Sequence, residues 1–376
     1  MAGAGPGDGA DARWMERALD LARNGLGNTW PNPAVGCVLV AADAVVGEGW
    51  TRPGGRPHAE TEALSAAGAR ARGATAYVTL EPCAHRGQTG PCAVALAEAG
   101  VARVVVALHD PDPRVSGRGL EILRKAGIAV ETGLHGERAA RLNAGFLHRL
   151  RSGRPRLTLK LASTLDGRIA LANGQSRWIT GPQARGFVHG LRATSDAVLI
   201  GAGTARADNP RLDVREGHET PRPPVRIVAD PGLSLPLTGH LAETAGTQPL
   251  WLLHAAHDHD PARAEALRGI GARLLPVPRD ARGALELPAA LRALGDAGLT
   301  SVLCEGGGRL AAGLIQTGLV DELILITAGK VIGAEGVPSV GPLALTDLGA
   351  APRFHPVEHR LLGEDVLTRW EPRPQG

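Results

Sequence analysis

The chain has 376 residues, more than one ordinary hydrophobic core holds, so two domains are expected. A hydrophobic content of 43% and a charged content of 21% are typical of a globular enzyme. The net charge is only +3, and no basic run with interleaved aromatic residues occurs, which argues against a nucleic-acid partner.

The first residues, MAGAGPGDGADARW, show neither the basic region nor the apolar stretch of a targeting signal. No apolar run approaches the ~20 residues that a membrane helix needs. We therefore expect a disordered extension over residues 1–12, a cytoplasmic location and no membrane partner. Thiols stay reduced in that compartment, so the cysteines direct attention to a metal and away from a disulfide.

The pattern after residue 12 predicts a three-layer α/β/α domain over 13–150. Short apolar segments alternate with amphipathic helical patterns, as in βαβ units with a mostly parallel sheet. A basic stretch with Gly and Pro, RLRSGRPR (149–156), then breaks the alternation. We place a linker at 151–156 and a second domain at 157–376. The predicted strands of the first domain are 34–40, 74–80, 102–108 and 128–133, and its predicted helices are 58–71, 91–99 and 117–126.

His58 and Glu60 lie at the start of the helix predicted over 58–71. Pro57 fits a helix start, and apolar residues follow at helical spacing. Because the two residues are two positions apart, their side chains point in different directions around the helix axis. A metal ligand with a neighbouring proton carrier suits that arrangement.

Two cysteines, Cys83 and Cys92, bracket a polar loop, EPCAHRGQTGPC (81–92). Cys92 follows a proline and precedes a helical pattern, and a helix N-terminus favours a thiolate. Cys37 and Cys304 instead lie in apolar strand patterns, where a free cysteine is usually a small core residue.

His-Ala-Glu followed by Pro-Cys and a second Cys is typical of zinc deaminases that act on nucleobases. Zinc with three protein ligands keeps one position for water and lowers the pKa of that water to roughly 7. Glu60, which is not a ligand, would then move protons from the water to the substrate. The alternative is a structural zinc with His85 as a fourth ligand.

EPCAHRGQTGPC resembles the E-P-C-x-H-x-G-x-T-x-P-C stretch of the bifunctional riboflavin-biosynthesis deaminase/reductase family, the RibD family. The segments PNPAVGCVLV (31–40) and HDPDPRVSGRGLEIL (109–123) resemble two further motifs of that family. The resemblance implies a cytidine-deaminase-like first domain with Glu60 as the proton shuttle. It implies the zinc ligands His58, Cys83 and Cys92, and contacts to the pyrimidine or its phosphoribosyl arm from Asn32, His85 and Asp110.

The residues themselves leave Asn32 open, because an asparagine between two prolines is equally a turn residue. Two positions depart from the family pattern. Gln88 stands where Lys or Arg is expected, and Arg86 is a possible replacement for that charge. Asp112 stands where Asn is usual, which adds an acidic group near an anionic substrate.

In the second half, RLTLKLASTLDGRIA (156–170) predicts a strand that contains Lys160 and runs into a polar loop. SVLCEGGGRLAAGLIQ (301–316) predicts a strand, a triple glycine and a helix. The glycines nominally fit a dinucleotide-binding fingerprint, but they lie about 150 residues into the domain, whereas a Rossmann domain has them at its first strand. Taken alone, they suit either a phosphate at a helix start or a tight turn for packing.

Four motifs of this half resemble the family's reductase, a dihydrofolate-reductase-like α/β domain that uses NADPH: K-x-A-x-[ST]-L-D-G-R, W-I-T, G-T-x-x-A-D-x-P and E-G-G. Asn209, where a second Asp is frequent, is a small departure. Lys160 and Glu305 are candidates for orienting or protonating the sugar. The implied NADPH contacts are Ala162, Trp178, Thr204, Asp208, Gly307, Gly308, Arg309, Leu310, Ala311, Ala312 and Gly313. The implied substrate contacts are Ser176, Arg192, Leu212, Arg215 and Glu305.

Together the two halves predict a two-step enzyme. The first domain would deaminate 2,5-diamino-6-(5-phosphoribosylamino)pyrimidin-4(3H)-one with one zinc ion, and the second would use NADPH to give 5-amino-6-(5-phosphoribitylamino)uracil. We also expect a homo-oligomer, a dimer or a tetramer. Two other classes stay open: a nucleic-acid deaminase with an accessory domain, and a non-catalytic module that binds zinc and nucleotide.

Overall fold

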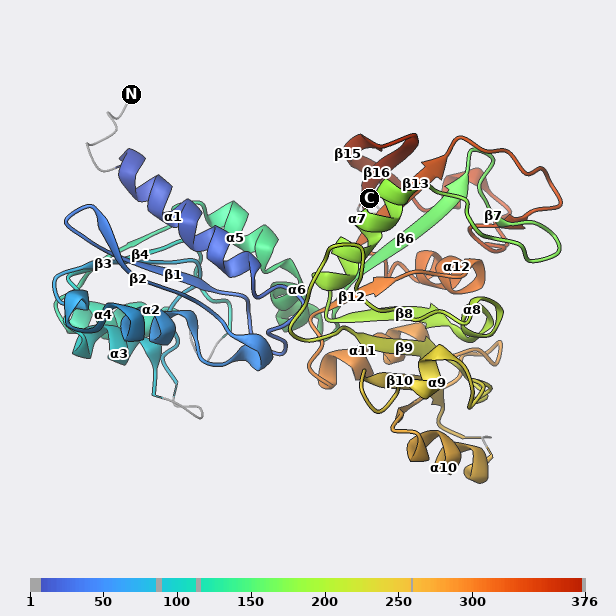
Figure 1. Cartoon of the computed structure of the whole chain (residues 1–376), viewed down its shortest axis with the longest axis horizontal. Coiled ribbons are helices and arrows are strands. Elements are labelled where there is room, and N and C mark those ends of the chain that lie inside the picture. The colour runs from blue at the N-terminus through green and yellow to red at the C-terminus, as the bar shows by residue number, and fades with distance from the viewer. Residues whose placement is uncertain (1–7, 86–89, 113–115, 258–259, 374–376) are drawn as a thin grey trace. The chain divides into compact units, whose positions relative to one another are not determined.

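The computed structural model describes residues 8–85, 90–112, 116–257 and 260–373 (Figure 1). The chain forms two compact units, Met1–Ser152 and Gly153–Gly376. The first unit contains a five-stranded sheet in the order β2-β1-β3-β4-β5. Its strands are β1 Gly36–Ala41, β2 Ala44–Trp50, β3 Thr75–Val78, β4 Arg103–Val106 and β5 Ala129–Thr132, and its α-helices are α1 Asp8–Arg23, α2 Ala59–Ala67, α3 Cys92–Glu98, α4 Arg118–Lys125, α5 Gly136–Leu142 and α6 Ala144–Ser152.

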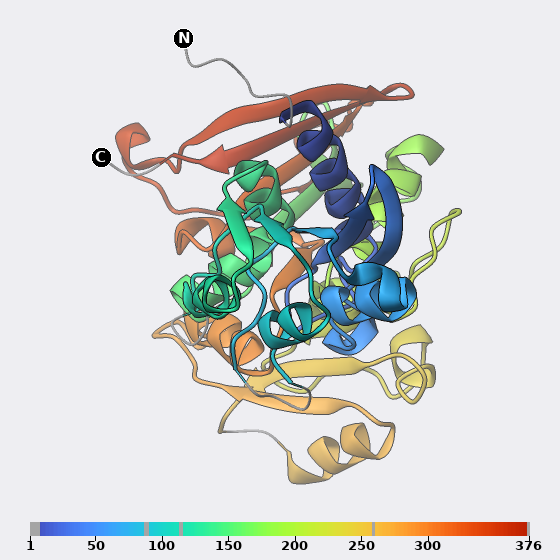
Figure 2. The same cartoon turned by 90° about the vertical axis from the view of Figure 1, so that its left-hand side faces the viewer.

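Helices cover both faces of this sheet, so the first unit has three layers, α/β/α (Figure 1). On one face Met15 and Leu19 of α1 and Ala139 of α5 pack on apolar side chains of β1, β3 and β4. On the other face α2, α3 and α4 bury alanines and leucines against the opposite side of the same strands. Figure 2 shows the same two helix layers from a second direction.

The sheet is mixed, so the expectation of a mostly parallel sheet is wrong for its first two strands. β3, β4 and β5 run parallel, but β1 pairs antiparallel with both β2 and β3. The β1–β2 hairpin turns at Ala42 and Asp43, both with positive φ (48° and 59°). Glycine and asparagine usually occupy such turns, so this sequence carries little hairpin signal and β2 is not predicted. Residues 8–12, expected in the extension, form the first turns of α1.

Two glycines of β2 let α2 lie directly on the hairpin. A Cβ on Gly47 would be 2.2 Å from the Ala63 carbonyl oxygen, and one on Gly49 would be 2.4 Å from the Ala59 carbonyl oxygen. Since real Cβ contacts do not fall below 3.0 Å, only glycine fits at either position. The close contact places the N-terminus of α2, with His58 and Glu60, over the sheet.

The second unit contains a nine-stranded sheet in the order β11-β10-β9-β8-β12-β6-β13-β16-β15. The first seven strands in that order are parallel, and the β15–β16 hairpin joins β13 antiparallel. The predicted strand with Lys160 and the predicted strand–glycine–helix unit are both present, as β6, β12 and α12. The strands are β6 Arg156–Thr164, β8 Ala197–Gly201, β9 Val225–Ala229, β10 Leu250–Ala255, β11 Arg273–Val277, β12 Ser301–Cys304, β13 Glu322–Ala328, β15 Phe354–Leu362 and β16 Asp365–Pro372, with a separate pair β7 Arg168–Ala170 and β14 Val337–Pro338. The α-helices are α7 Pro182–Ala193, α8 Ala202–Asp208, α9 His240–Glu243, α10 Pro261–Gly269, α11 Leu287–Asp296 and α12 Gly308–Gln316.

Strands β6, β12 and β8 are neighbours and run parallel. Their carboxyl ends therefore lie at one edge of the sheet, which is where parallel α/β sheets usually place ligands. Glu305 follows β12 at this edge, and α8 with Thr204 follows β8. The topology alone thus gathers several of the predicted reductase residues.

Candidate active sites

The three candidate zinc ligands of the first unit lie together. His58 Nδ1 is 3.3 Å from Cys92 Sγ and 3.7 Å from Cys83 Sγ, and the three ligand atoms lie within 4.8 Å of one another. A tetrahedral zinc ion with ordinary Zn–S and Zn–N bonds would hold N and S about 3.5 Å apart. Two thiols and one imidazole at these separations fit zinc in both chemistry and geometry.

Different elements supply the three side chains. His58 is the N-cap of α2, Cys92 is the first residue of α3 as predicted, and Cys83 lies in the loop after β3. The Cys92 backbone N–H donates to Cys83 Sγ at 3.3 Å, and the Ala93 N–H donates to the Cys83 carbonyl at 3.2 Å. These bonds hold the first cysteine against the helix that begins with the second.

Glu60 lies in the first turn of α2 and is only 4% exposed. Burial and, after it, the Cys83 thiolate raise the pKa of its carboxyl to about 7, against the opposing effect of His58. A carboxyl group with a pKa near neutrality can both accept and donate a proton at physiological pH, as a proton shuttle requires.

The two thiols have opposite pKa shifts. The hydrogen bond from Cys92 and, to a smaller extent, His58 lower the pKa of Cys83 to about 4, against the effect of burial. The hydrogen bond to Cys83, together with burial, raises the pKa of Cys92. The helix end at Cys92 alone therefore does not make it a thiolate. Two adjacent thiolates need a stronger positive charge, which a bound zinc ion would supply.

His85 is exposed and is not a member of the metal-ligand group found among the described residues. Asn32 lies in a turn, with its backbone N–H bonded to the Thr29 carbonyl, and its side-chain Nδ2 donates to the Gly55 carbonyl at 2.8 Å. The structure therefore shows the turn role of Asn32 and also ties its amide to the segment that leads into His58.

Asp110 and Asp112 follow β4 and are both buried, 7% and 6% exposed. The Asp112 backbone N–H donates to Asp110 Oδ1 at 2.9 Å. Asp112, the departure from the family pattern, thus braces Asp110 through its backbone, which Asn would do equally well. Gln88 and Arg86 lie outside the described residues.

In the second unit, Arg192 of α7 and Glu305 form a two-pronged ion pair. Arg192 Nε and Nη2 lie 2.6 and 3.0 Å from the two Glu305 carboxylate oxygens, and the side chains are 12% and 10% exposed. Burial would raise the pKa of Glu305, but Arg192 and then Lys160 lower it to about 2. Burial lowers the pKa of Lys160, while the charge of Glu305 opposes that shift. Arg192 and Glu305 thus form a largely buried ion pair, and the charge of the partly buried Lys160 interacts with it.

Arg192 was expected to contact substrate, but Glu305 occupies one side of its guanidinium, and its Nη1 donates to the Asp213 carbonyl at 3.0 Å. These contacts hold segment 212–215, with buried Leu212 and exposed Arg215, against α7. His189 takes part as well, because its Nδ1 accepts from the Arg215 N–H at 3.1 Å. Sequence reasoning missed His189; its spacing of three from Arg192 on a helix, which puts both on one face, was the available signal.

The predicted NADPH contacts come from neighbouring strand ends. The Gly201 N–H at the end of β8 donates to the Gly306 carbonyl at 2.9 Å. A Cβ on Gly307 would be 3.0 Å from Thr204 Oγ1, and one on Gly308 would be 2.8 Å from the Pro338 carbonyl oxygen. The glycines therefore have a packing reason. Residues Gly308–Gly313 form the first turns of α12, whose N-cap Gly307 makes no side-chain cap, so the N–H groups there suit a phosphate.

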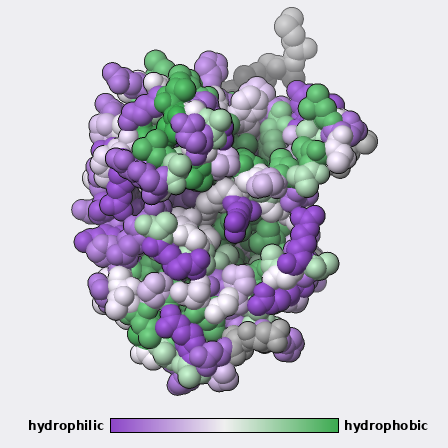
Figure 3. Space-filling model, turned by 90° about the vertical axis from the view of Figure 1, so that its right-hand side faces the viewer, coloured by the Kyte–Doolittle hydropathy of each residue, from purple (hydrophilic) through white to green (hydrophobic). Residues whose placement is uncertain are grey.

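Trp178 and Ser176 lie in the segment between β7 and α7, and Trp178 is 62% exposed. Lys330 Nζ donates to the Trp178 carbonyl at 2.5 Å, and Arg177 Nη2 donates to the Asp208 carbonyl at 3.0 Å. The first bond ties the segment to the loop after β13, and the second ties it to the end of α8. Ala162 lies two residues beyond Lys160 on β6, paired with Ile326. On the face in Figure 3 the exposed apolar side chains form separate patches among polar ones.

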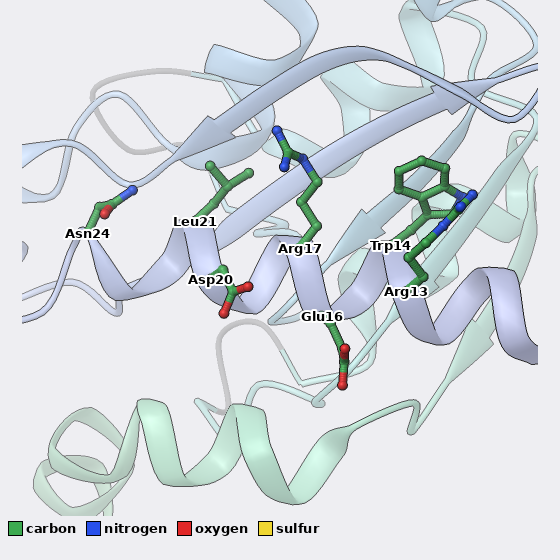
Figure 4. Close-up of a pocket in the computed structure, with 7 residues that line it drawn as sticks. All are labelled: Arg13, Trp14, Glu16, Arg17, Asp20, Leu21 and Asn24. Atoms are coloured by element: carbon green, nitrogen blue, oxygen red, sulfur yellow. The ribbon is translucent and has the colours of Figure 1, made fainter.

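A surface hollow along α1 lies apart from the chemistry described above. Its lining comes from one helix and contains neither a candidate zinc ligand nor Glu60 (Figure 4). The hollow is lined by Arg13, Trp14, Glu16, Arg17, Asp20, Leu21 and Asn24.

None of the helices in the described part of the chain is both long and apolar enough to cross a bilayer.

Comparison with known proteins gives two family matches. Residues 9–108 match the cytidine and deoxycytidylate deaminase zinc-binding region, and residues 155–368 match the RibD C-terminal domain. The riboflavin biosynthesis protein RibD of Escherichia coli K12 is 43% identical over 367 residues, 95% of this chain and 98% of that protein. The corresponding protein of Aquifex aeolicus is 38% identical over 357 residues, 95% and 97% of the two chains.

Solved structures agree. One form of Acinetobacter baumannii RibD superposes with a TM-score of 0.86 at 38% identity, over 97% of this chain and 99% of that one. A diaminohydroxyphosphoribosylaminopyrimidine deaminase/5-amino-6-(5-phosphoribosylamino)uracil reductase from Thermotoga maritima gives 0.83 at 32% identity, with the same coverage. These matches confirm the fold predicted for each half.

Proposed function

The chain belongs to the RibD family of bifunctional riboflavin-biosynthesis enzymes, and from that premise we propose which residues carry each of its two reactions. The deaminase half contains a zinc-binding region, and the reductase half uses NADPH. We assign to this chain the two reactions in the name of the Thermotoga relative: deamination of the diamino-pyrimidinone and reduction of its phosphoribosyl arm.

In the deaminase, His58, Cys83 and Cys92 would hold zinc, and zinc bound there would make a water molecule acidic enough to be deprotonated at neutral pH. Glu60 takes a proton from the attacking water and gives it to the ring nitrogen while the C–O bond forms. It then takes the second proton from that oxygen, as the oxygen becomes a carbonyl, and gives it to the amine, which leaves as ammonia. Asn32 and Asp110 line the site from the turn before β1 and the segment after β4. The exposed His85 is assigned to the substrate and not to the metal.

In the reductase, NADPH supplies the hydride, and the chain supplies placement and a proton. Lys160 is the proton donor toward the opening ribose, because burial lowers its pKa and therefore eases release of the proton. Glu305 stays ionised, and its negative charge favours the protonated form of Lys160. Arg215, with its side chain half exposed, is the phosphate contact, whereas Arg192 acts mainly through Glu305.

The observation that carries the proposal is the open three-ligand cluster with a buried carboxyl group beside it. A non-catalytic zinc module has no use for Glu60, whose carboxyl is 4% exposed and hydrogen-bonded to Cys92. A nucleic-acid deaminase would need a basic entry lined by aromatic side chains, and the chain has only 3% aromatic residues.

The test is ammonia release from the phosphoribosylaminopyrimidine, measured with and without NADPH. We expect ammonia in both cases, and NADPH oxidation only once the deaminated pyrimidine is present. The matched control is Glu60→Gln, which should keep one zinc per chain and lose about 10²–10⁴-fold in ammonia release. Zinc binding without ammonia release by the wild-type chain would refute the proposal in favour of a binding module.

A homo-oligomer and a cytoplasmic location remain predictions for this chain. Light scattering coupled to size-exclusion chromatography tests the first, with a monomer as the contradicting result. Fractionation of the producing cells tests the second.

A further inference from the structure

Glu81 lies between β3 and the ligand candidate Cys83, and its carboxylate is fully buried. Glu81 Oε1 accepts from the Gly119 backbone N–H at 3.1 Å, and Oε2 accepts from the Gly117 N–H at 3.1 Å and, more weakly, from the Asp110 N–H at 3.4 Å. The Glu81 backbone N–H donates to the Leu108 carbonyl at 2.9 Å. Every one of these partners belongs to the segment that follows β4.

The sheet explains why Glu81 reaches this segment. β3 and β4 are neighbouring parallel strands with Val78 opposite Val106, so the chain leaves both strands side by side at their carboxyl ends. One exit leads to Cys83 and the other to Asp110. Glu81 thus joins the segment with a zinc ligand to the segment with a substrate contact.

Glu81 also caps α4. The N-cap of that helix, Gly117, has φ of 76° and no side chain, so it cannot bond the free N–H groups of the first turn. The Glu81 carboxylate, 36 residues earlier in the sequence, accepts from the N-cap and from the second helical residue. A negative charge at a helix N-terminus is also favoured by the helix dipole.

A second contact involves Pro82, the residue after Glu81. A Cβ on Gly119 would stand 2.0 Å from the Pro82 carbonyl oxygen, so the two segments touch and no side chain fits between them. The contact and the hydrogen bonds to Glu81 are independent, yet both hold residues 81–82 against residues 117–119.

We propose that Glu81 is a positioning residue of the deaminase, whose carboxylate holds Asp110 and the N-terminus of α4 (residues 117–119) at a set distance from Cys83. The consequence for substrate rests on the deaminase function proposed above. Glu81 itself touches neither zinc nor substrate. Its removal should weaken substrate binding before it affects the metal or the chemical step.

Glu81→Gln tests this proposal. The substitution barely changes the side-chain volume, but it replaces one acceptor oxygen by an NH₂ group that faces backbone N–H donors. We expect one zinc per chain and an unchanged rate of NADPH-dependent reduction of supplied deaminated substrate. The deaminase KM should rise by about tenfold or more while kcat stays within about threefold. The control is Glu121→Gln, which removes an exposed acid from the first turn of the same helix and should leave KM unchanged.

Gly119→Ala disturbs the contact between Pro82 and α4 from the side of the helix. Its Cβ would force Pro82 and α4 apart, so KM should rise with zinc retained, as in Glu81→Gln. Hydrogen exchange gives a readout without activity: the Gly117 and Gly119 amides should be protected in the wild-type chain and should exchange at least about tenfold faster in Glu81→Gln.

An unchanged KM together with unchanged amide exchange in Glu81→Gln would overturn the proposal. Loss of zinc with loss of both kinetic constants would also overturn it, because Glu81 would then support the metal and not the substrate segment. If the wild-type chain released no ammonia, the proposed function would fall, while the exchange measurement would still decide whether Glu81 holds this segment.

Discussion

The pKa values of two largely buried carboxyl groups, Glu60 and Glu305, are shifted in opposite directions because their neighbours carry opposite charges. Burial and, after it, the nearby Cys83 thiolate raise the pKa of Glu60 to about 7. Burial acts in the same sense on Glu305, but Arg192 and Lys160 outweigh it and lower that pKa to about 2. The first group is suited to proton transfer and the second to permanent charge.

Two single-residue substitutions in the first unit should differ in the amount of zinc that the protein retains. Cys92→Ala should lose most of its zinc, because one of three ligands is gone, whereas His85→Ala should keep a full equivalent, because the exposed His85 lies outside the ligand group. Metal analysis of the purified variants checks both. A zinc-free His85→Ala protein would establish the four-ligand structural site instead.

The Glu305 ion pair predicts a pH dependence of stability. Because the folded-state pKa is lowered from 4.5 to about 2, the ionised group stabilises the folded chain above pH 4.5, and this contribution is lost as the pH falls toward 2. The difference in unfolding free energy between wild type and Glu305→Gln should shrink by about 3 kcal/mol over that range. Urea unfolding followed by tryptophan fluorescence measures it. The exposed Glu364→Gln should show no such trend.

At the scale of elements, the deaminase site depends on how closely α2 approaches the β1–β2 hairpin. The helix carries His58 and Glu60 at its first turn, and Gly47 and Gly49 of β2 touch its backbone. Backbone packing, more than side-chain packing, therefore sets the height of the helix above the sheet. The positions of His58 and Glu60 therefore depend on that contact.

Gly49→Ala should disturb the site from a distance. Its Cβ would stand 2.4 Å from the Ala59 carbonyl oxygen, one residue after His58. We expect a loss of about 1–3 kcal/mol in unfolding free energy and a weaker hold on zinc, measured by competition with a chelator. The control is Gly186→Ala on α7, where a Cβ meets nothing within 4 Å and should be neutral or stabilising. Unchanged zinc affinity in Gly49→Ala would contradict the argument.

At the scale of the whole molecule, each unit has its own core. The helix layers of the first unit enclose β1, β3 and β4, and separate apolar clusters around β8–β10 and around β13 stabilise the second. The candidate zinc ligands all lie in the first unit, and the candidate NADPH contacts all lie in the second. The two sets of candidate residues therefore belong to different units.

The two activities should therefore respond independently to substitution in the intact chain. Glu60→Gln should stop ammonia release but still reduce supplied deaminated substrate, and Glu305→Ala should do the reverse. Fragments 1–152 and 153–376 should each retain one activity if each stays soluble alone. The two-site assignment would be wrong if zinc-loaded Glu60→Gln protein failed to reduce the supplied intermediate.

Most of what could be predicted from the sequence lies within short contiguous segments. The order of strands and helices around β1, β3, β4 and β12 and the helix start at Cys92 follow from local spacing, and the candidate ligands were recognised by the short motifs in which each of them lies. Local patterns suffice there because a helix start or a ligand loop is built from neighbouring residues. The family resemblance rests on the same short motifs.

Only the tertiary structure decided the rest, because the partners are far apart in the sequence and their energetics depend on burial. The Arg192–Glu305 pair spans 113 residues, and the bond from Gly119 to Glu81 spans 38. The β1–β2 hairpin escaped prediction because Ala42 and Asp43 adopt a turn that their residue types do not favour. By itself the sequence determined which side chains are available for the chemistry. The fold decided which of them are buried beside an opposite charge, and burial with its neighbours sets the charge state that each one brings to the reaction.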